Sequence, residues 1–137
     1  MAKRSWPKVC WAGLLGVCLT PVFASAVLAE SFPFGQELML DVRPMKGSKR
    51  VPIVEVREDG SAEIDLWCNS LRAQFVVAAD TVTVITGELS GRSCSPDRAK
   101  GDDEVLTALQ QVTHWQRDGS RVMLIGPTSL RFRIPTN

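Results

Sequence analysis

The cysteines are the most reactive side chains in this chain of 137 residues, and their placement favours a cross-link over catalysis. Cys10 and Cys18 lie within the first 29 residues, whereas Cys68 and Cys94 lie 26 positions apart in the rest of the chain. This spacing lacks the close cysteine pairs of a zinc site. If the first 29 residues direct export, the remaining pair meets an oxidising compartment, and we expect one disulfide between Cys68 and Cys94. Two free, buried cysteines are the alternative.

A single histidine, His114, restricts the catalytic chemistry that the chain can offer. A Ser/His or Cys/His nucleophile system would need this residue, and so would most zinc sites. It stands beside Trp115, with no Asp or Glu at a telling spacing. We therefore interpret His114 as an ordinary packed or surface histidine.

Paired carboxylates offer a second route to catalysis. Glu63 and Asp65 share one face of a predicted strand, and two carboxylates can act as the acid and base of a hydrolase. Arg57, Arg72 and Arg131 provide counter-charges, and the period-two spacing fits the solvated face of a sheet equally well. We favour the solvated face.

The densest acidic residues are candidates for cation binding. Asp97, Asp102, Asp103 and Glu104 could hold calcium, but the sequence lacks the alternating Asp-x-Asp-x-Asp-Gly loop. Acids at the start of a helix pair with free backbone N–H groups and favour the helix dipole. We interpret these residues as a solvated helix start and predict no catalytic residues, no cofactor and no metal.

Residues 1–29 have the pattern of a secretory signal peptide. Three basic residues and no acid precede an apolar run at residues 9–17. Val27 and Ala29 occupy positions −3 and −1 of a cleavage site before Glu30. We predict a periplasmic or secreted protein.

Two alternatives to cleavage keep the chain at the membrane. An uncleaved anchor is disfavoured because Thr20, Pro21 and Ser25 interrupt the apolar stretch. Acylation of Cys18 would make a lipoprotein, but Val17 is bulkier than the residue that this processing expects. Membrane association is predicted only in that second case.

Composition describes the rest, residues 30–137, as one domain. Three of the 16 Lys and Arg residues, and none of the 15 Asp and Glu residues, lie in the leader, so the remaining net charge is −2. Nucleic-acid binding rests on clustered cations, and no basic run here exceeds Lys49-Arg50. We predict no nucleic-acid partner.

Alternating apolar and polar residues predict a β-rich fold. Pro52 indicates that its strand lies at a sheet edge, and Asp118-Gly119 is typical of a hairpin turn. The predicted strands are residues 38–43, 51–56, 62–67, 73–77, 81–86, 114–117, 121–125 and 130–134.

One helix is predicted over residues 102–112, with an apolar stripe at Val105, Leu106, Leu109 and Val112. Ser95-Pro96 could begin an earlier turn, with Pro96 at the first helical position. We predict an α+β, β-rich fold, in which a curled antiparallel sheet of about eight short strands carries one helix.

Several segments together resemble the META domain family, which includes the heat-shock-associated envelope protein HslJ. Residues 68–75 resemble its Cys-Asn motif, although Trp67 stands where the family has glycine. Residues 104–109 resemble the family helix, and residues 112–119 and 130–132 its closing hairpin and last strand. Cys94 occupies the place of a frequent second cysteine. The resemblance covers about residues 62–132.

The resemblance implies a small envelope domain without a recognised catalytic site, in a family linked to stress or antibiotic tolerance, motility and secretion. We expect a non-enzymatic structural or protein-interaction role, with an envelope protein as partner. The candidate interaction surface comprises Trp67, Trp115, Arg131 and Arg133, the arginines also protecting a strand edge.

Two other functions stay open at this stage. A periplasmic inhibitor of a lysozyme-like hydrolase could insert the loop at residues 90–97 into a cleft. An enzyme could use Glu63, Asp65 or His114.

Overall fold

The computed structural model describes residues 29–136. The predicted signal peptide, with Cys10, Cys18 and the proposed lipid site, therefore lies outside the described residues except for Ala29. No helix in the described part of the chain is long and apolar enough to cross a membrane.

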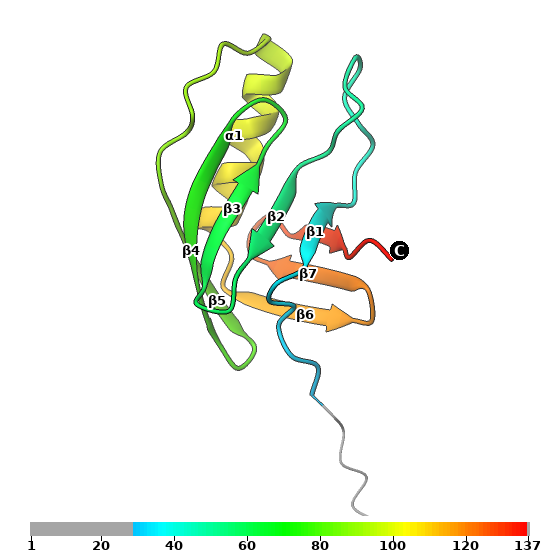
Figure 1. The fold of residues 1–137 in the computed structure, drawn as a ribbon, viewed down its shortest axis with the longest axis vertical. Helices are drawn as coiled ribbons and strands as arrows, with labels where there is room; N and C mark the ends of the chain where they lie inside the picture. Colours follow the sequence, from blue (N-terminus) through cyan, green and yellow to red (C-terminus); the bar gives the residue numbers. More distant parts are fainter. Residues whose placement is uncertain (1–28, 137) are drawn as a thin grey trace, which may run out of the picture.

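Eight antiparallel strands form a closed barrel in which each strand pairs with the next and the last pairs with the first (Figure 1). The predicted β-rich fold with one helix is confirmed. The strands are β1 (Glu37–Leu40), β2 (Ile53–Val56), β3 (Ser61–Asp65), β4 (Ser70–Ala78), β5 (Thr81–Thr86), β6 (His114–Asp118), β7 (Arg121–Ile125) and β8 (Leu130–Arg133).

The period-two alternation places one row of side chains from each strand inside the barrel. Leu38, Ile64 and Leu124 are fully buried there, and Phe132 is 1% exposed. Burial of such side chains contributes roughly 1.5–3 kcal/mol each, which makes this interior the main source of stability.

Closure of the barrel overturns two predictions about edges. Pro52 does not mark an edge strand, because β2 pairs with both β1 and β3. Pro52 lies just before β2, and its carbonyl accepts a hydrogen bond from the Leu40 N–H (2.9 Å). Because Pro52 lies outside the strand, its lack of an N–H removes no hydrogen bond from the sheet. Arg131 and Arg133 do not protect an edge either, because β8 pairs with β1 and β7.

Val42 also departs from the prediction. It was expected on the buried face of the first strand, but β1 ends at Leu40 and Val42 is 46% exposed. The chain leaves the barrel at this point and makes a long excursion, residues 41–52, before β2 begins; we call it the β1–β2 loop.

The helix α1 (Pro96–Gln110) packs against β5 and β8, and along the chain it connects β5 to β6. These two strands share one register pair, Thr81 with His114. Leu109 is fully buried, and Ala108 is 2% exposed in the same core. The Gln110 side-chain amide donates to the Thr86 hydroxyl (2.8 Å), which fixes the end of the helix to β5.

The predicted helix start at Asp102 is wrong by six residues. The helix begins at Pro96, whose fixed backbone angle suits the first helical position, as the earlier-turn alternative proposed. Asp102 therefore lies within the helix and is 1% exposed, so it does not cap a helix end. Val112 is buried but lies beyond the end of α1 at Gln110.

Candidate functional site: a basic cleft beside the disulfide

Cys68 and Cys94 form a disulfide, as predicted, with their Cα atoms 6.0 Å apart. Cys68 lies between β3 and β4, and Cys94 lies just before α1. The bond therefore ties the segment between β5 and α1, residues 87–95, to the β3–β4 turn; we call this segment the disulfide loop.

A buried carboxylate supports the disulfide from inside. One oxygen of Asp102, Oδ1, accepts hydrogen bonds from the backbone N–H groups of Trp67 (2.7 Å) and Cys68 (3.2 Å). The other, Oδ2, accepts from the backbone N–H of Asn69 (2.8 Å) and from its side-chain amide (3.1 Å). A carboxylate accepts only, and it meets four donors here, which explains why an acid occurs at a buried helical position.

Asn69 extends this network to the disulfide loop. Its Oδ1 accepts hydrogen bonds from the Ser90 hydroxyl (3.1 Å) and the Arg92 backbone N–H (2.8 Å). Its amide also donates to Cys94 Sγ (3.2 Å). We call Asp102, Asn69 and the disulfide the latch. No buried side-chain nitrogen or oxygen among the described residues lacks a partner, so the latch is fully satisfied.

The latch does not fit a metal ion. Ligand atoms of Cys68, Cys94 and Asp102 lie within 4.8 Å of one another, and this is the one such group in residues 29–136. A metal needs deprotonated thiolates, but the two sulfurs are bonded to each other and the carboxylate already accepts four hydrogen bonds.

A cleft of about 590 Å³ opens beside the latch, and we call it the basic cleft. Its floor is one row of cross-strand neighbours on the outside of the barrel, in which each residue is in register with the next. The row is Arg133, Met39, Ile53, Asp65 and Ser70. The β1–β2 loop forms one wall and the disulfide loop contributes Arg92 and Ser93 to another.

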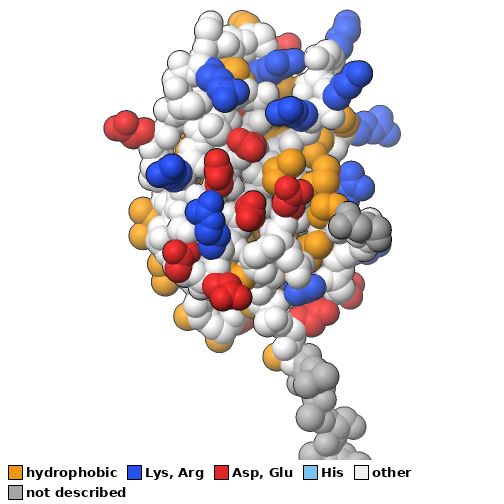
Figure 2. All heavy atoms as spheres, in the orientation of Figure 1, with side chains coloured by type: hydrophobic (Ala, Val, Ile, Leu, Met, Phe, Trp, Pro, Cys, Tyr) orange, Lys and Arg blue, Asp and Glu red, His pale blue; other side chains and the backbone are white. Residues whose placement is uncertain are grey.

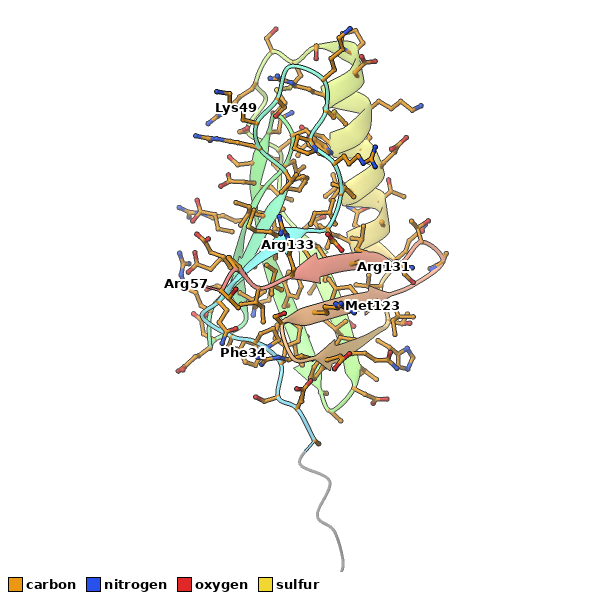
Figure 3. The ribbon with its side chains drawn as sticks, turned by 90° about the vertical axis from the view of Figure 1, so that its right-hand side faces the viewer. Phe34, Lys49, Arg57, Met123, Arg131 and Arg133 are labelled. Carbon is orange, nitrogen blue, oxygen red and sulfur yellow. A yellow bond between two sulfur atoms is a disulfide. The ribbon has the colours of Figure 1, made fainter. Side chains whose placement is uncertain are left out.

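The lining of this cleft is strongly cationic. Asp65 is its one acidic residue, against five basic ones: Lys49, Arg50, Arg92, Arg98 and Arg133. Figure 2 shows the molecule in the orientation of Figure 1, with basic side chains gathered at its upper right, beside hydrophobic side chains. In Figure 3, Lys49 lies near the tip of the β1–β2 loop and Arg133 lies below it, at the end of β8.

The walls are tied to the helix as well as to the barrel. Arg98, in the first turns of α1, donates to the Gly47 carbonyl (3.1 Å) and so holds the β1–β2 loop. Trp67 packs over Gly101: a Cβ at that position would lie 2.7 Å from the indole Cδ1, so only glycine allows this close approach.

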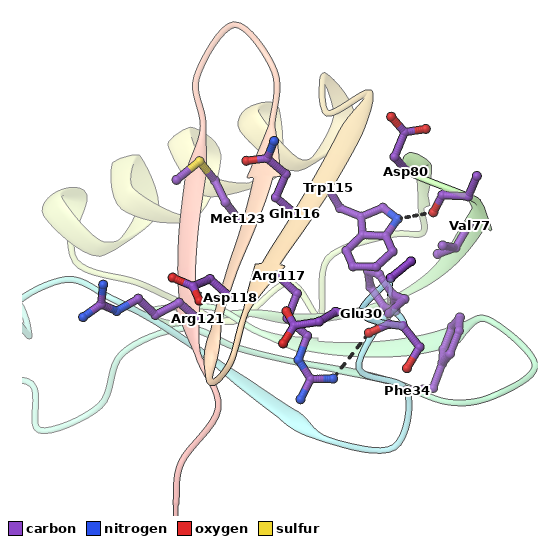
Figure 4. A pocket seen from close by; sticks show the side chains of 14 residues that line it. Glu30, Phe34, Val77, Asp80, Trp115, Gln116, Arg117, Asp118, Arg121 and Met123 are labelled. Carbon is purple, nitrogen blue, oxygen red and sulfur yellow. Dashed lines mark hydrogen bonds between the residues drawn. The ribbon is translucent and has the colours of Figure 1, made fainter. Parts of the chain in front are cut away.

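A second hollow, the aromatic groove, has a volume of about 1140 Å³ and lies between residues 29–34 and the β6–β7 hairpin (Figure 4). Phe32 is 5% exposed there and packs edge-on against Trp115, with ring centroids 5.2 Å apart. The Trp115 indole N–H donates to the Ala79 carbonyl (2.8 Å), and Arg117 donates to the Ser31 carbonyl (3.3 Å).

The predicted interaction residues do not share one surface. Trp67 and Arg133 line the basic cleft, and Arg131 lines a neighbouring cavity of about 510 Å³ to which Trp67 also contributes. Trp115 is 7% exposed and belongs to the aromatic groove.

The residues considered for catalysis are dispersed. Glu63 forms an exposed ion pair with Arg57 (3.7 Å), whereas Asp65 lines the basic cleft. His114 is exposed on β6, three strands away from β3 in the barrel order, and its ring Nδ1 lies 2.9 Å from the Thr113 hydroxyl. Of the acids near the predicted helix start, Asp102 belongs to the latch and Glu104 pairs with Lys100 (3.7 Å).

Sequence reasoning missed most of the cleft. Asn69 and Asp102 were noticed, but for a motif and a helix start, and not as partners in one network. Lys49, Arg50 and Arg92 were not selected as site residues. Lys49 and Arg50 lie in the β1–β2 loop and Arg92 lies in the disulfide loop, and only the folded chain brings the two loops together. The signal that could have pointed to Asp102 is its position after Gly101, inside a helix that Pro96 begins.

The described residues define a small antiparallel β-barrel domain that is cross-linked by a disulfide and carries one helix packed against β5 and β8. The META domain family model matches residues 35–133, and the chain belongs to the META domain family. No curated protein matches this chain. A crystal structure of a DUF4847 family protein from Bacteroides vulgatus is similar, with a TM-score of 0.48 and 15% identity. That similarity covers 60% of this chain and 57% of the other.

Proposed function

We propose that this chain is a non-enzymatic domain, exported to the envelope of a Gram-negative-type cell, that acts by binding an envelope protein. A contribution to stress tolerance is part of the proposal, in line with the roles associated with META domains. The Cys68–Cys94 disulfide and the latch that supports it carry the proposal.

The disulfide supports export because such bonds persist in oxidising compartments and are rare in the cytosol. The surrounding contacts are built for the bonded state. Asn69 donates to Cys94 Sγ, and its side-chain oxygen accepts from two groups of the disulfide loop. These contacts hold Cys94 at the position where it bonds to Cys68.

A binding role is supported by the way in which the disulfide loop is presented. Residues 90–93 are exposed, yet the Ser90 N–H donates to the Ser70 carbonyl (2.9 Å) and the Arg92 N–H donates to Asn69. A loop that is already fixed loses little conformational entropy when a partner binds.

Site-specific cross-linking in intact cells tests the proposal. A photo-reactive residue replaces Ser93 in the disulfide loop, and a matched variant carries it at Arg72, an exposed position on β4 outside the cleft. We expect one envelope protein to be attached at Ser93 and not at Arg72, and the adduct to disappear when Cys94 is replaced by alanine.

Three results would contradict the proposal. Identical adducts at both positions would mean that the disulfide loop does not select a partner. Recovery of the chain in the cytosol would exclude export. Turnover of a cell-wall substrate that a single Glu63→Ala, Asp65→Ala or His114→Ala change abolishes would make the domain an enzyme.

The fixed loop also favours a second candidate function, inhibition of a lysozyme-like hydrolase. Inhibitors of this kind gain affinity when a pre-formed loop enters the active-site cleft. A panel of lysozymes assayed with the purified chain tests it. Inhibition that Arg92→Gln weakens and Arg72→Gln leaves unchanged would favour the inhibitor, and no inhibition across the panel would exclude it.

A further inference from the structure

We infer that the basic cleft is a binding site for an organic phosphate, a ligand that joins a phosphate group to an apolar portion. This inference goes beyond the proposed partner protein. It rests on the charge, chemistry and shape of the cleft, and it holds whatever the larger role of the domain.

The cleft is positively charged, whereas the domain as a whole has a negative net charge. Residues 30–137 have a net charge of −2, whereas five cations and one acid line this single hollow. Two ion pairs occur among the described residues, Arg57 with Glu63 and Lys100 with Glu104, and neither includes a cation of the cleft. Five cations around one hollow, none of them in these ion pairs, raise the local potential and attract a compact anion.

The kind of cation favours phosphate. Four of the five are arginines, and a planar guanidinium donates two parallel hydrogen bonds to phosphate oxygens. A carboxylate offers one negative charge, whereas a phosphate ester places up to two on three oxygens in the same small space. The cleft therefore matches a phosphate group better than a single acidic side chain.

The walls that carry these cations are already positioned. Arg92 lies in the loop that the disulfide and Asn69 hold, and Arg133 lies on a strand paired on both sides. Arg98 holds the β1–β2 loop through Gly47. A pre-formed site binds without first ordering its own loops.

The floor indicates that the ligand is more than inorganic phosphate. Met39 and Ile53 form its centre, and Val42 and Trp67 complete an apolar area beside the cations. A volume of about 590 Å³ lies within the range of small-molecule sites, roughly 300–1,000 Å³, and exceeds what one phosphate fills.

Calorimetry on the full chain, purified from cells in its disulfide-bonded form, tests the inference with phenyl phosphate and inorganic phosphate as probes. We expect phenyl phosphate to bind more tightly than inorganic phosphate, and added salt to weaken both. The double variant Arg92→Gln/Arg133→Gln should lose at least about tenfold in affinity, whereas Arg72→Gln should match the parent chain. Among residues 29–136, neither replaced side chain of the double variant makes a hydrogen bond, and an unchanged urea midpoint will verify that the variant folds.

Further arms identify the source of the phosphate. Vesicles of phosphatidylcholine with and without phosphatidylglycerol test a lipid headgroup. Binding to the anionic vesicles that depends on Arg92 and Arg133 assigns the cleft to a headgroup, and binding to phenyl phosphate alone assigns it to a soluble ester. Equal affinity of parent and double variant for both would overturn the inference. So would tighter binding of a tetraglutamate peptide, which would make the cleft a site for acidic polypeptide.

Discussion

The basic cleft and the aromatic groove are both formed where loops lie against the barrel, but different forces hold them. At the cleft, a disulfide and a buried carboxylate with four hydrogen bonds fix the loops. At the groove, Phe32 packs against Phe34, Phe75 and Trp115, and the hydrogen bonds that Arg117 and Gly119 make to residues 30 and 31 are exposed to solvent. One hollow is held by directional and covalent bonds, the other by apolar contact.

The difference matters because the two kinds of support fail in different ways. Hydrogen bonds to a buried carboxylate are lost together when the carboxylate is removed, and the donors that stay buried then lack partners. Apolar contacts are lost in proportion to the atoms removed, and neighbouring rings can partly fill the space. The cleft should therefore be rigid and sensitive to single polar changes, and the groove more tolerant.

The largest effect is expected at Asp102. Asp102→Ala leaves the backbone N–H groups of Trp67, Cys68 and Asn69 without an acceptor, and we expect a loss of about 4 kcal/mol in the free energy of unfolding. Urea unfolding measures it. The neighbouring exposed acid gives the control: Asp103→Ala should change stability by less than about 0.5 kcal/mol. Equal losses for the two variants would mean that the carboxylate does not hold the cleft.

Removal of the disulfide should have the next largest effect. The variant Cys68→Ala/Cys94→Ala opens a loop with a sequence separation of 26, and loop-closure entropy predicts a loss of about 3 kcal/mol. Hydrogen exchange should accelerate more in the disulfide loop than in the β6–β7 hairpin, which loses protection only through the lower global stability. Equal acceleration in both regions would show that the hollows are not independent.

Phe32→Ala disturbs the groove and tests whether the cleft stays unaffected. The ring is 5% exposed, and its loss should cost about 2–3 kcal/mol, near the low end for phenylalanine because the neighbouring rings can close in. In NMR spectra, exchange of the Trp115 indole N–H should accelerate more than exchange of the Asn69 backbone N–H, which donates to Asp102. Equal acceleration at the two groups would contradict the separation of the two hollows.

A smaller, stabilising effect is expected at Ala79, which lines the groove with a positive φ of 52°. Ala79→Gly removes the steric cost of a left-handed backbone and should stabilise the fold by up to about 1 kcal/mol. Ala78→Gly, at the end of β4, is the matched control and should destabilise it by a similar amount. Thermal unfolding shows whether each change raises or lowers the stability. Destabilisation by both changes would mean that the backbone at residue 79 is not strained.

The smallest effect is expected at the β2–β3 turn, which belongs to neither hollow. Hydrogen bonds from the Ser61 hydroxyl and backbone N–H lower the pKa of Asp59 below its ordinary value. A lowered pKa in the folded state gives stability that is present above the unfolded pKa of about 3.9 and lost as the pH falls through the folded value. Asp59→Asn should therefore flatten the acid limb of the pH–stability curve slightly. An unchanged limb would show that the turn contributes nothing.

The strands could be predicted from sequence because burial inside a barrel repeats at every second residue. Burial alternates from residue to residue along β5 and β7, and their predicted bounds agree with the structure. The closure of the barrel could not be predicted in this way. It depends on the pairing of β1 with β8, and no local pattern reports a contact between Leu40 and Phe132.

The helix start and the cleft could not be predicted for a related reason. Asp102, Asp103 and Glu104 have the composition of a helix start, and only the position of the β3–β4 turn shows that Asp102 is buried beneath it. The cleft depends on cross-strand register, which places Arg133 beside Met39 although they lie at opposite ends of the domain sequence. The disulfide could be predicted because it needed only the pattern of a signal peptide and a count of the cysteines that follow it.

Thiol trapping of the native chain in fractionated cells, followed by mass spectrometry, tests the central claim most directly. We expect a chain in the envelope fraction that starts at Glu30, in which Cys68 and Cys94 form a disulfide and do not react with the alkylating reagent. A folded chain in the cytosol, with both cysteines alkylated, would contradict it.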